Sequence, residues 1–204
     1  MASTIVFIGD SITDAGRRDD PDRHLGHGYV RLVAEELANR GDDRVVVNTG
    51  ISGDRAVDLR ARWERDALAH EPELLSIHVG VNDTWRRYDS DAPTSPEDFA
   101  ATYRSLLADA QARQAPRFIM MEPYVLPVTS EQKRWGAEDL DAKRAVVASL
   151  ATEYGAAFVR LQSILSDAAA QNGGAAAIAA DGVHPTPLGS TLIAGAWLAA
   201  EATL

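Results

Sequence analysis

The sequence predicts an α/β fold, a three-layer α/β/α sandwich with about five parallel strands. Three observations indicate it: short apolar runs recur along the chain, amphipathic helical patterns alternate with them, and no linker-like segment interrupts the series. Continuous apolar strands are typical of a parallel sheet that helices cover on both faces. With 204 residues, 46% of them hydrophobic, the chain can bury one substantial core, so we expect a single domain over residues 1–204.

The expected strands are short and rich in β-branched or aliphatic residues, which favour an extended backbone. They are Thr4–Ile8, Val45–Val47, Leu74–Val79, Phe118–Met121 and Ala157–Leu161. Ligands of open α/β sheets bind outside the carboxyl ends of the strands. Polar residues that directly follow these runs are therefore candidates for a functional site.

The expected helices carry apolar residues at helical spacing. They are Tyr29–Asn39, Ala56–Ala69, Pro96–Ala112, Glu138–Tyr154 and Pro187–Ala200. Gly41 follows the first of them in the preferred position for a helix stop. Before the third, Ser95 provides a capping hydroxyl and Pro96 suits the first turn.

Composition excludes several classes of function. The formal net charge of −10 argues against nucleic-acid binding, which requires clustered Lys and Arg, and is compatible with a neutral sugar ester as substrate. The absence of cysteine excludes disulfides and thiolate metal sites. The sequence contains no run of eighteen apolar residues, so we expect no membrane span. No signal-peptide pattern precedes the first strand, so we expect a cytoplasmic protein.

Ser11 is the candidate nucleophile, because Gly9-Asp10-Ser11 directly follows the first apolar strand. A strand ending there presents one hydroxyl at the edge of the sheet, within reach of a substrate. An alternative is that Ser11 caps a short helix. Both interpretations can hold, because backbone N–H groups at a helix N-terminus favour a developing anion.

His184 is the candidate general base, and Asp181, three residues upstream, is the candidate carboxylate that orients it. One loop can place the carboxylate on the far ring nitrogen while the near nitrogen faces Ser11. The alternative is a surface Asp-Gly turn followed by an incidental histidine. A metal site at His24 and His27 is a weaker alternative, because no third ligand is evident.

Gly53 and Asn82 are the candidate oxyanion donors, because each lies in a segment that follows a predicted strand. Gly53 could offer its backbone N–H to a substrate oxygen without a side chain in the way, and Asn82 could offer its amide. The alternatives are a tight glycine turn and an Asx-turn. Ser11, Gly53 and Asn82 are all expected at the same edge of the sheet.

The combination resembles the four sequence blocks of the SGNH, or GDSL-type, hydrolase superfamily. The blocks are Gly9-Asp10-Ser11, Gly53, Gly80-x-Asn82-Asp83 and Asp181-x-x-His184, which occur in the family's order and span almost the whole chain. The resemblance implies a flavodoxin-like sandwich and a Ser11–His184–Asp181 triad. It also implies an oxyanion hole from the N–H groups of Ser11 and Gly53 and the amide of Asn82, with no metal or organic cofactor.

A finer resemblance is to the bacterial branch that includes intracellular acetylxylan esterases, whose members remove acetyl groups from xylo-oligosaccharides. It rests on the stretches Gly9–Gly16, Gly26-x-Gly28-Tyr29-Val30, Gly50–Gly53 and Asn82-Asp83-x-Trp85-Arg86. One departure is Ala180, which stands where that branch often has an aromatic residue before the triad aspartate. Loss of that ring is expected to widen the acyl pocket or weaken sugar stacking.

Three further residues are candidates for substrate binding: Asp10 beside the nucleophile, and Trp85 and Tyr88 after Asn82. The two aromatic rings lie one helical turn apart and could stack on sugar faces, although packing in the core is an equal alternative. The segment 122–137, which holds Tyr124 and Trp135, is long enough to be a lid, a pocket wall or a contact in a homo-oligomer.

These features predict a serine esterase that hydrolyses short-chain, acetyl esters, with carbohydrates such as acetylated xylo-oligosaccharides as the expected substrates. A thioesterase or lysophospholipase would share the reaction centre but would need a longer apolar acyl channel. A carbohydrate-binding protein without catalysis is a third alternative, disfavoured by the presence of every catalytic side chain.

Overall fold

A computed structural model describes residues 3–21 and 24–204 of the chain. Five parallel strands form one sheet in the order β2-β1-β3-β4-β5. They are β1 (Thr4–Gly9), β2 (Val45–Asn48), β3 (Leu74–His78), β4 (Arg117–Met121) and β5 (Ala157–Val159). The five strands and their parallel pairing confirm the sequence prediction.

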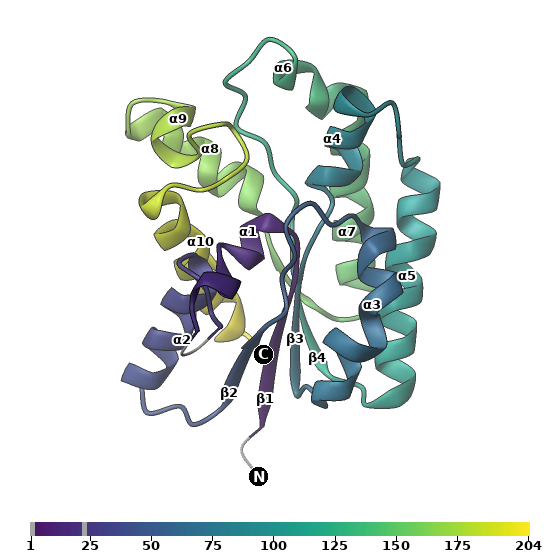
Figure 1. Cartoon of the computed structure of the whole chain (residues 1–204), viewed down its shortest axis with the longest axis vertical. Coiled ribbons are helices and arrows are strands. Elements are labelled where there is room, and N and C mark those ends of the chain that lie inside the picture. The colour runs from purple at the N-terminus through teal and green to yellow at the C-terminus, as the bar shows by residue number, and fades with distance from the viewer. Residues whose placement is uncertain (1–2, 22–23) are drawn as a thin grey trace.

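Helices cover both faces of the sheet, as Figure 1 shows with α2, α8 and α10 on one side and α3, α5 and α7 on the other. The helices are α1 (Ser11–Asp14), α2 (Tyr29–Asn39), α3 (Ala56–Asp66), α4 (Val81–Asp89), α5 (Pro96–Arg113), α6 (Gln132–Trp135), α7 (Asp141–Glu153), α8 (Leu161–Gln171), α9 (Ala175–Ile178) and α10 (Pro187–Glu201). The short 3₁₀-helices η1 (Arg17–Asp19) and η2 (Leu68–His70) and the π-helical segment η3 (Gly136–Leu140) complete the series.

The core consists of two apolar clusters, one on each side of the sheet. Alternation along β1 divides its side chains between them: Ile5 and Phe7 belong to the cluster under α2 and α10, and Val6 and Ile8 to the cluster under α3 and α5. All four side chains are fully buried. This two-sided burial explains why the strand reads as a continuous apolar run in the sequence.

The structure corrects the expected ends of two elements and adds helices that the sequence did not predict. The fifth strand ends at Val159, and Leu161 begins α8, a helix absent from the sequence prediction; Leu161 is buried as the first residue of its apolar stripe. The helix expected over 56–69 ends at Asp66 and continues as the turn η2. The helix α4 is likewise absent from the sequence prediction.

Two helix termini match their predicted chemistry. The Ser95 hydroxyl accepts a hydrogen bond from the Asp98 N–H at 3.0 Å, and Pro96 is the first residue of α5. Gly41 follows α2 with φ of 78°, the left-handed conformation that a helix stop favours. Among the described residues, no helix combines the length and hydropathy that crossing a membrane would require.

Candidate active site

The short helix α1 follows the carboxyl end of β1 (Figure 1). Ser11 is its first residue. Asp10 is the N-cap of this helix: its Oδ1 accepts from the Ile12 N–H at 3.0 Å. The cap is therefore Asp10 and not Ser11, which corrects the alternative considered above. A Cβ on Gly9 would collide with the carbonyl oxygen of His78, so glycine is required where β1 lies against β3.

The structure brings Ser11, His184 and Asp181 together across 173 positions of sequence. Ser11 Oγ lies 2.8 Å from His184 Nε2, and His184 Nδ1 lies 2.6 Å from Asp181 Oδ2. A carboxylate only accepts hydrogen bonds, so Nδ1 carries the proton and Nε2 is the acceptor for the Ser11 hydroxyl. The predicted convergence of these three side chains is thus present in the structure.

The Asp181 carboxylate is fixed on both oxygens. Its Oδ1 accepts from the N–H groups of Val183 at 2.9 Å and of His184 at 2.7 Å, while Oδ2 faces the His184 ring. Partial burial raises the pKa of Asp181, but the hydrogen bonds from His184 and Val183 outweigh it and leave the pKa below its ordinary value. Asp181 therefore stays ionised and holds the ring in one orientation.

Gly53 and Asn82, the candidate oxyanion donors, lie on neighbouring segments that are tied to each other. Asn82 Nδ2 donates to the Asp54 carbonyl at 3.1 Å. Asn82 is the second residue of α4, so it does not form the Asx-turn considered as an alternative. Gly53 has φ of 89°, in the left-handed region that favours glycine.

The Gly53 segment is docked against the nucleophile helix. The N–H and hydroxyl of Ser52 donate to Asp14 Oδ2 at 3.0 and 2.8 Å, and the Ile51 N–H donates to the Gly9 carbonyl at 3.0 Å. Asp14 belongs to α1, the helix that Ser11 begins. The segments that carry the three candidate oxyanion donors therefore meet at one edge of the sheet.

Arg62 of α3, a residue that no sequence motif singles out, joins the segments at this edge of the sheet. Its guanidinium donates to the carbonyls of Gly9 at 3.0 Å and Thr49 at 2.6 Å, and it pairs with Asp54 at 2.7 Å and Asp66 at 3.0 Å. The Arg62 side chain is only 7% exposed. One buried cation thus joins the end of β1 to the segment that leads to Gly53.

The segment 122–137 packs against the loop that carries Asp181 and His184. The carbonyls of three successive residues each accept one hydrogen bond from it. Gln132 Nε2 donates to Asp181 O at 2.7 Å, the Leu126 N–H to Gly182 O at 2.8 Å, and the Tyr124 hydroxyl to Val183 O at 2.6 Å. We call Tyr124, Leu126 and Gln132 the carbonyl clamp.

The two large aromatic rings of this segment are buried within the chain. Tyr124 is fully buried and Trp135 is 1% exposed, so neither ring is available for a contact with another subunit. The hydrogen bonds of the carbonyl clamp hold residues 122–137 against the 181–184 loop, and we call residues 122–137 the wall segment. Sequence patterns could not reveal the clamp, because its acceptors are backbone carbonyls some 50 residues away.

The aromatic side chains of α4 pack toward the same wall. The Trp85 ring lies 5.4 Å from the Trp135 ring and 6.2 Å from the His184 ring, measured between centroids. Tyr88 stacks on Trp135 at 5.5 Å and donates its hydroxyl to Glu138 at 2.9 Å. Both Trp85 and Tyr88 are half-buried, so each ring packs in part against the protein and remains in part exposed.

A cavity of about 230 Å³ opens beside the nucleophile. It is lined by Ser11 and His184 together with Ile12, Ala15, His27 and Ser190. Asp10, which the sequence suggested as a substrate-binding residue, is 1% exposed and does not line it. In the structure Asp10 caps the helix α1 that Ser11 begins, and it does not face the cavity where a substrate would bind.

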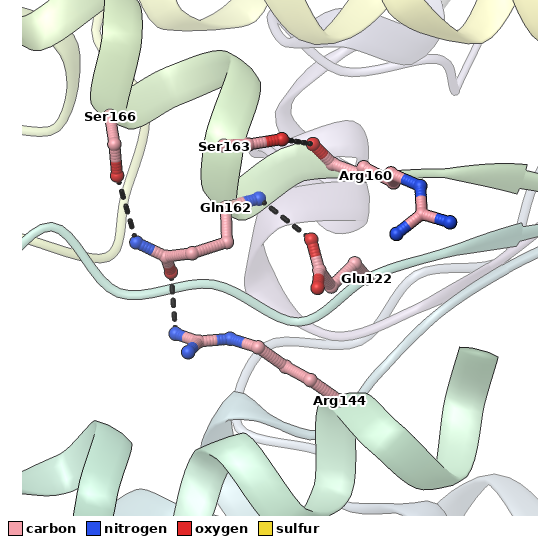
Figure 2. Close-up of a pocket in the computed structure, with 6 residues that line it drawn as sticks. All are labelled: Glu122, Arg144, Arg160, Gln162, Ser163 and Ser166. Carbon is pink, nitrogen blue, oxygen red and sulfur yellow. Dashed lines mark hydrogen bonds between the residues drawn. The ribbon is translucent and has the colours of Figure 1, made fainter. Parts of the chain in front are cut away.

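A second polar cavity, of about 290 Å³, lies behind the wall segment, and none of the predicted site residues lines it (Figure 2). Gln162 is at its centre: its Oε1 accepts from the Val125 N–H at 3.1 Å, and its own N–H donates to Glu122 at 2.9 Å. Arg144 bonds Gln162 and donates to the Pro123 carbonyl at 3.0 Å. These contacts fix the start of the segment that carries the carbonyl clamp.

Two buried carboxyl groups lie under the site, Asp10 and Asp83. Burial raises the pKa of Asp10 to about 7 and that of Asp83 to about 6. The charge of Asp83 raises the pKa of Asp10 further, whereas the nearby Lys143 lowers that of Asp83. Asp83 Oδ2 accepts from the Ala56 N–H at 3.1 Å, at the start of α3. One oxygen of each carboxyl is buried without a partner among the described residues.

No group of three His, Asp or Glu side chains within residues 3–21 and 24–204 is placed to hold a metal ion. The weaker alternative of a metal site at His24 and His27 thus finds no third ligand there.

Comparison with known proteins places the chain in a family. The model of the GDSL-like lipase/acylhydrolase family matches residues 7–192. The chain therefore belongs to this family, and it is a carboxylic ester hydrolase of the GDSL type.

Relatives match over nearly the full length of the chain. The acetylxylan esterase of Geobacillus stearothermophilus is 34% identical over 95% of this chain and 91% of its own length. Its crystal structure, under the name Axe2, has a TM-score of 0.87 at 34% identity, with 98% and 94% of the two chains covered. A protein of Parabacteroides merdae described as a GDSL-like lipase has a TM-score of 0.91 at 33% identity, covering 99% and 96%. These likenesses confirm the predicted fold class.

Proposed function

We propose that the protein is a serine esterase that removes acetyl groups from carbohydrates such as acetylated xylo-oligosaccharides. The observation that carries the proposal is the unbroken chain of contacts from Ser11 Oγ through His184 to Asp181, at 2.8 and 2.6 Å. Nucleophile, base and orienting carboxylate are the three groups that acyl transfer by this route requires.

In the proposed mechanism, Ser11 Oγ attacks the ester carbonyl carbon while His184 Nε2 takes the hydroxyl proton, and Asp181 stabilises the imidazolium. The oxyanion accepts hydrogen bonds from the N–H groups of Ser11 and Gly53 and from the Asn82 amide. The intermediate collapses, and the alcohol leaves with the proton from His184. Water, deprotonated by His184, then attacks the acyl-serine, and the proton returns to Ser11 as the acid is released.

Solved variants of Axe2 support these roles. Three of them are described as catalytic mutants, in which a serine, an aspartate and a histidine are each replaced by alanine. The aspartate and histidine are three positions apart in that protein, the spacing of Asp181 and His184 here. The proposal transfers the three roles to Ser11, Asp181 and His184.

The sugar substrate is supported by the relatives and by the cavity beside Ser11. Axe2 is described as an acetyl-xylooligosaccharide esterase. The cavity of about 230 Å³ beside Ser11 is lined in part by the polar side chains of His27 and Ser190, which suit a substrate that bears hydroxyl groups. A long acyl chain, as a lysophospholipase or acyl thioesterase requires, would need a longer apolar channel.

The test compares acetate release from acetylated xylo-oligosaccharides with the hydrolysis of 4-nitrophenyl esters of increasing chain length. The proposal predicts activity on the acetylated sugars, a sharp preference for acetate among the aryl esters, and loss of both in Ser11→Ala. Rates that rise with acyl length would favour the thioesterase or lysophospholipase alternative. Full activity of Ser11→Ala would refute the mechanism.

A further inference from the structure

The cavity beside Ser11 contains two polar side chains that the proposed mechanism does not use, His27 and Ser190. His27 precedes α2, and Ser190 lies in the first turns of α10, so they reach the cavity from different elements. Both share its lining with Ser11 and His184.

Ser190 is 5% exposed, yet its hydroxyl forms no hydrogen bond to any residue that the structure describes. A helical serine commonly bonds the carbonyl four residues earlier. The adjacent Thr191 does so, with its hydroxyl 3.0 Å from Pro187 O. Because Ser190 lines the cavity and its hydroxyl keeps its donor and acceptor sites unused among the described residues, the hydroxyl can bond a ligand that enters the cavity.

His27 lies at the exposed rim of the same cavity. Its backbone N–H donates to the Ala15 carbonyl at 2.9 Å, which holds the residue beside the end of α1. Its imidazole forms no hydrogen bond within residues 3–21 and 24–204, and a neutral ring offers one donor and one acceptor. The remaining lining, with Ile12, Ala15 and Pro185, is apolar.

The position of the cavity relative to the reacting atoms indicates which part of an ester it takes. The leaving alcohol oxygen must lie by His184 Nε2, because that atom returns the proton to it. His184 lines the cavity, whereas the candidate oxyanion donors Gly53 and Asn82 do not. The alcohol therefore extends into the cavity, and the oxyanion points away from it.

We propose that the cavity binds a hydroxyl-bearing alcohol, such as one sugar unit of the ester, and that Ser190 and His27 hydrogen-bond its free hydroxyl groups. The proposal rests on the proposed function and deepens it: these two side chains determine selectivity for the alcohol. Apolar Ile12 and Ala15 face its carbon atoms, and the uncharged donors and acceptors suit a neutral polyol.

The test uses two esters that share an acetyl group and differ in the alcohol: an acetylated xylo-oligosaccharide and 4-nitrophenyl acetate. Ser190→Ala and His27→Ala are each expected to raise KM for the sugar ester about 5- to 10-fold with little change in kcat. Their kcat/KM for the aryl ester should stay within twofold. His27→Gln, which retains a donor and an acceptor, should recover part of the loss.

Thr191→Ala and His24→Ala are the matched controls, each an exposed residue of similar type outside the cavity, and both should behave as the unsubstituted protein. A binding measurement separates this proposal from catalysis. Deacetylated xylo-oligosaccharide should bind Ser11→Ala, and an added Ser190→Ala should weaken that binding about 5-fold or more.

Two kinetic outcomes overturn the proposal: equal losses on both esters, or unchanged kinetics on the sugar ester. Failure of the oligosaccharide to bind Ser11→Ala also overturns it, even when 4-nitrophenyl acetate is hydrolysed normally. If the unsubstituted protein hydrolyses neither ester, the proposed function fails first and this proposal with it.

Discussion

The Asp10 carboxyl places a buried titratable group directly before the nucleophile in the chain. One oxygen caps α1 through the Ile12 N–H, and the other is buried without a partner among the described residues. Burial raises the pKa of Asp10 to about 7, with a further contribution from the nearby Asp83 and Asp54. In the folded protein the carboxyl therefore takes up a proton far more readily than in the unfolded chain.

This raised pKa predicts a stability that falls with pH. A carboxyl with a higher pKa in the folded state stabilises the fold fully below its unfolded value near 4, and that contribution is lost as the pH rises through about 7. Between pH 5 and 8 the loss is about 2–3 kcal/mol. The Asp10→Asn side chain can still cap α1 but cannot ionise. The free energy of unfolding of this variant should therefore fall by about 2–3 kcal/mol less between pH 5 and 8 than that of the unsubstituted protein.

Urea unfolding at pH 5 and pH 8 measures the difference, with the exposed Asp91→Asn as the control, which should follow the unsubstituted protein. Equal slopes for Asp10→Asn and the unsubstituted protein would contradict a raised pKa.

Asn82 supports a second prediction at the scale of a residue. One N–H of its amide is used by the Asp54 carbonyl, and the other remains to donate to an oxyanion. Loss of such a donor costs about 100- to 1,000-fold in kcat, or about 3–4 kcal/mol. We expect Asn82→Ala to show a loss of this size with KM little changed, and Asn39→Ala on the surface to show none. An Asn82→Ala kcat above a tenth of normal would remove Asn82 from the oxyanion hole.

At the scale of an element, the wall segment and the 181–184 loop act as one unit. The segment carries no group that touches Ser11, yet it holds the carbonyls of Asp181, Gly182 and Val183. Gln162 in turn bonds Arg144 and the Glu122 carboxylate at the start of the segment (Figure 2). The orientation of His184 therefore depends on contacts well outside the reaction centre.

Tyr124→Phe tests this dependence by removing one donor of the carbonyl clamp with almost no change in volume. We expect kcat to fall about 10-fold, because the loop loses its fixed position and Val183 O loses its partner. The low-field proton resonance of the His184 Nδ1–H should broaden at the same time, a change that a general loss of stability would not produce.

Tyr103→Phe is the matched control. Tyr103 is also fully buried, but its hydroxyl has no partner among the described residues, so its removal should leave kcat unchanged. An unaltered kcat and resonance in Tyr124→Phe would show that the carbonyl clamp does not position His184.

At the scale of the whole molecule, the parallel sheet gathers residues from both ends of the chain at one edge. The strand order places β1 in the interior of the sheet, between β2 and β3, so the segments after these three strands surround Ser11. Asp181 and His184 reach the same place through the loop before α10. This arrangement follows from the rule that open α/β sheets bind ligands at their carboxyl ends.

How much of this could be predicted from the sequence depends on the kind of contact. Ser11, Asp181 and His184 could be found, because each is a reactive residue type in a short motif beside an element boundary. Arg62 and Gln132 could not, because the contacts by which they hold the site together are to backbone carbonyls of distant segments, which leave no side-chain pattern. The boundary between β5 and α8 was missed because Ala157–Leu161 reads as one apolar run, with only Arg160 breaking it.

Covalent labelling with a fluorophosphonate, followed by peptide mapping, tests most directly whether Ser11 is the activated nucleophile. We predict one adduct per chain, located on Ser11 and formed in parallel with the loss of esterase activity. Labelling should disappear in Ser11→Ala and become far slower in His184→Ala. An adduct on another residue, or full inactivation with Ser11 unmodified, would contradict the account.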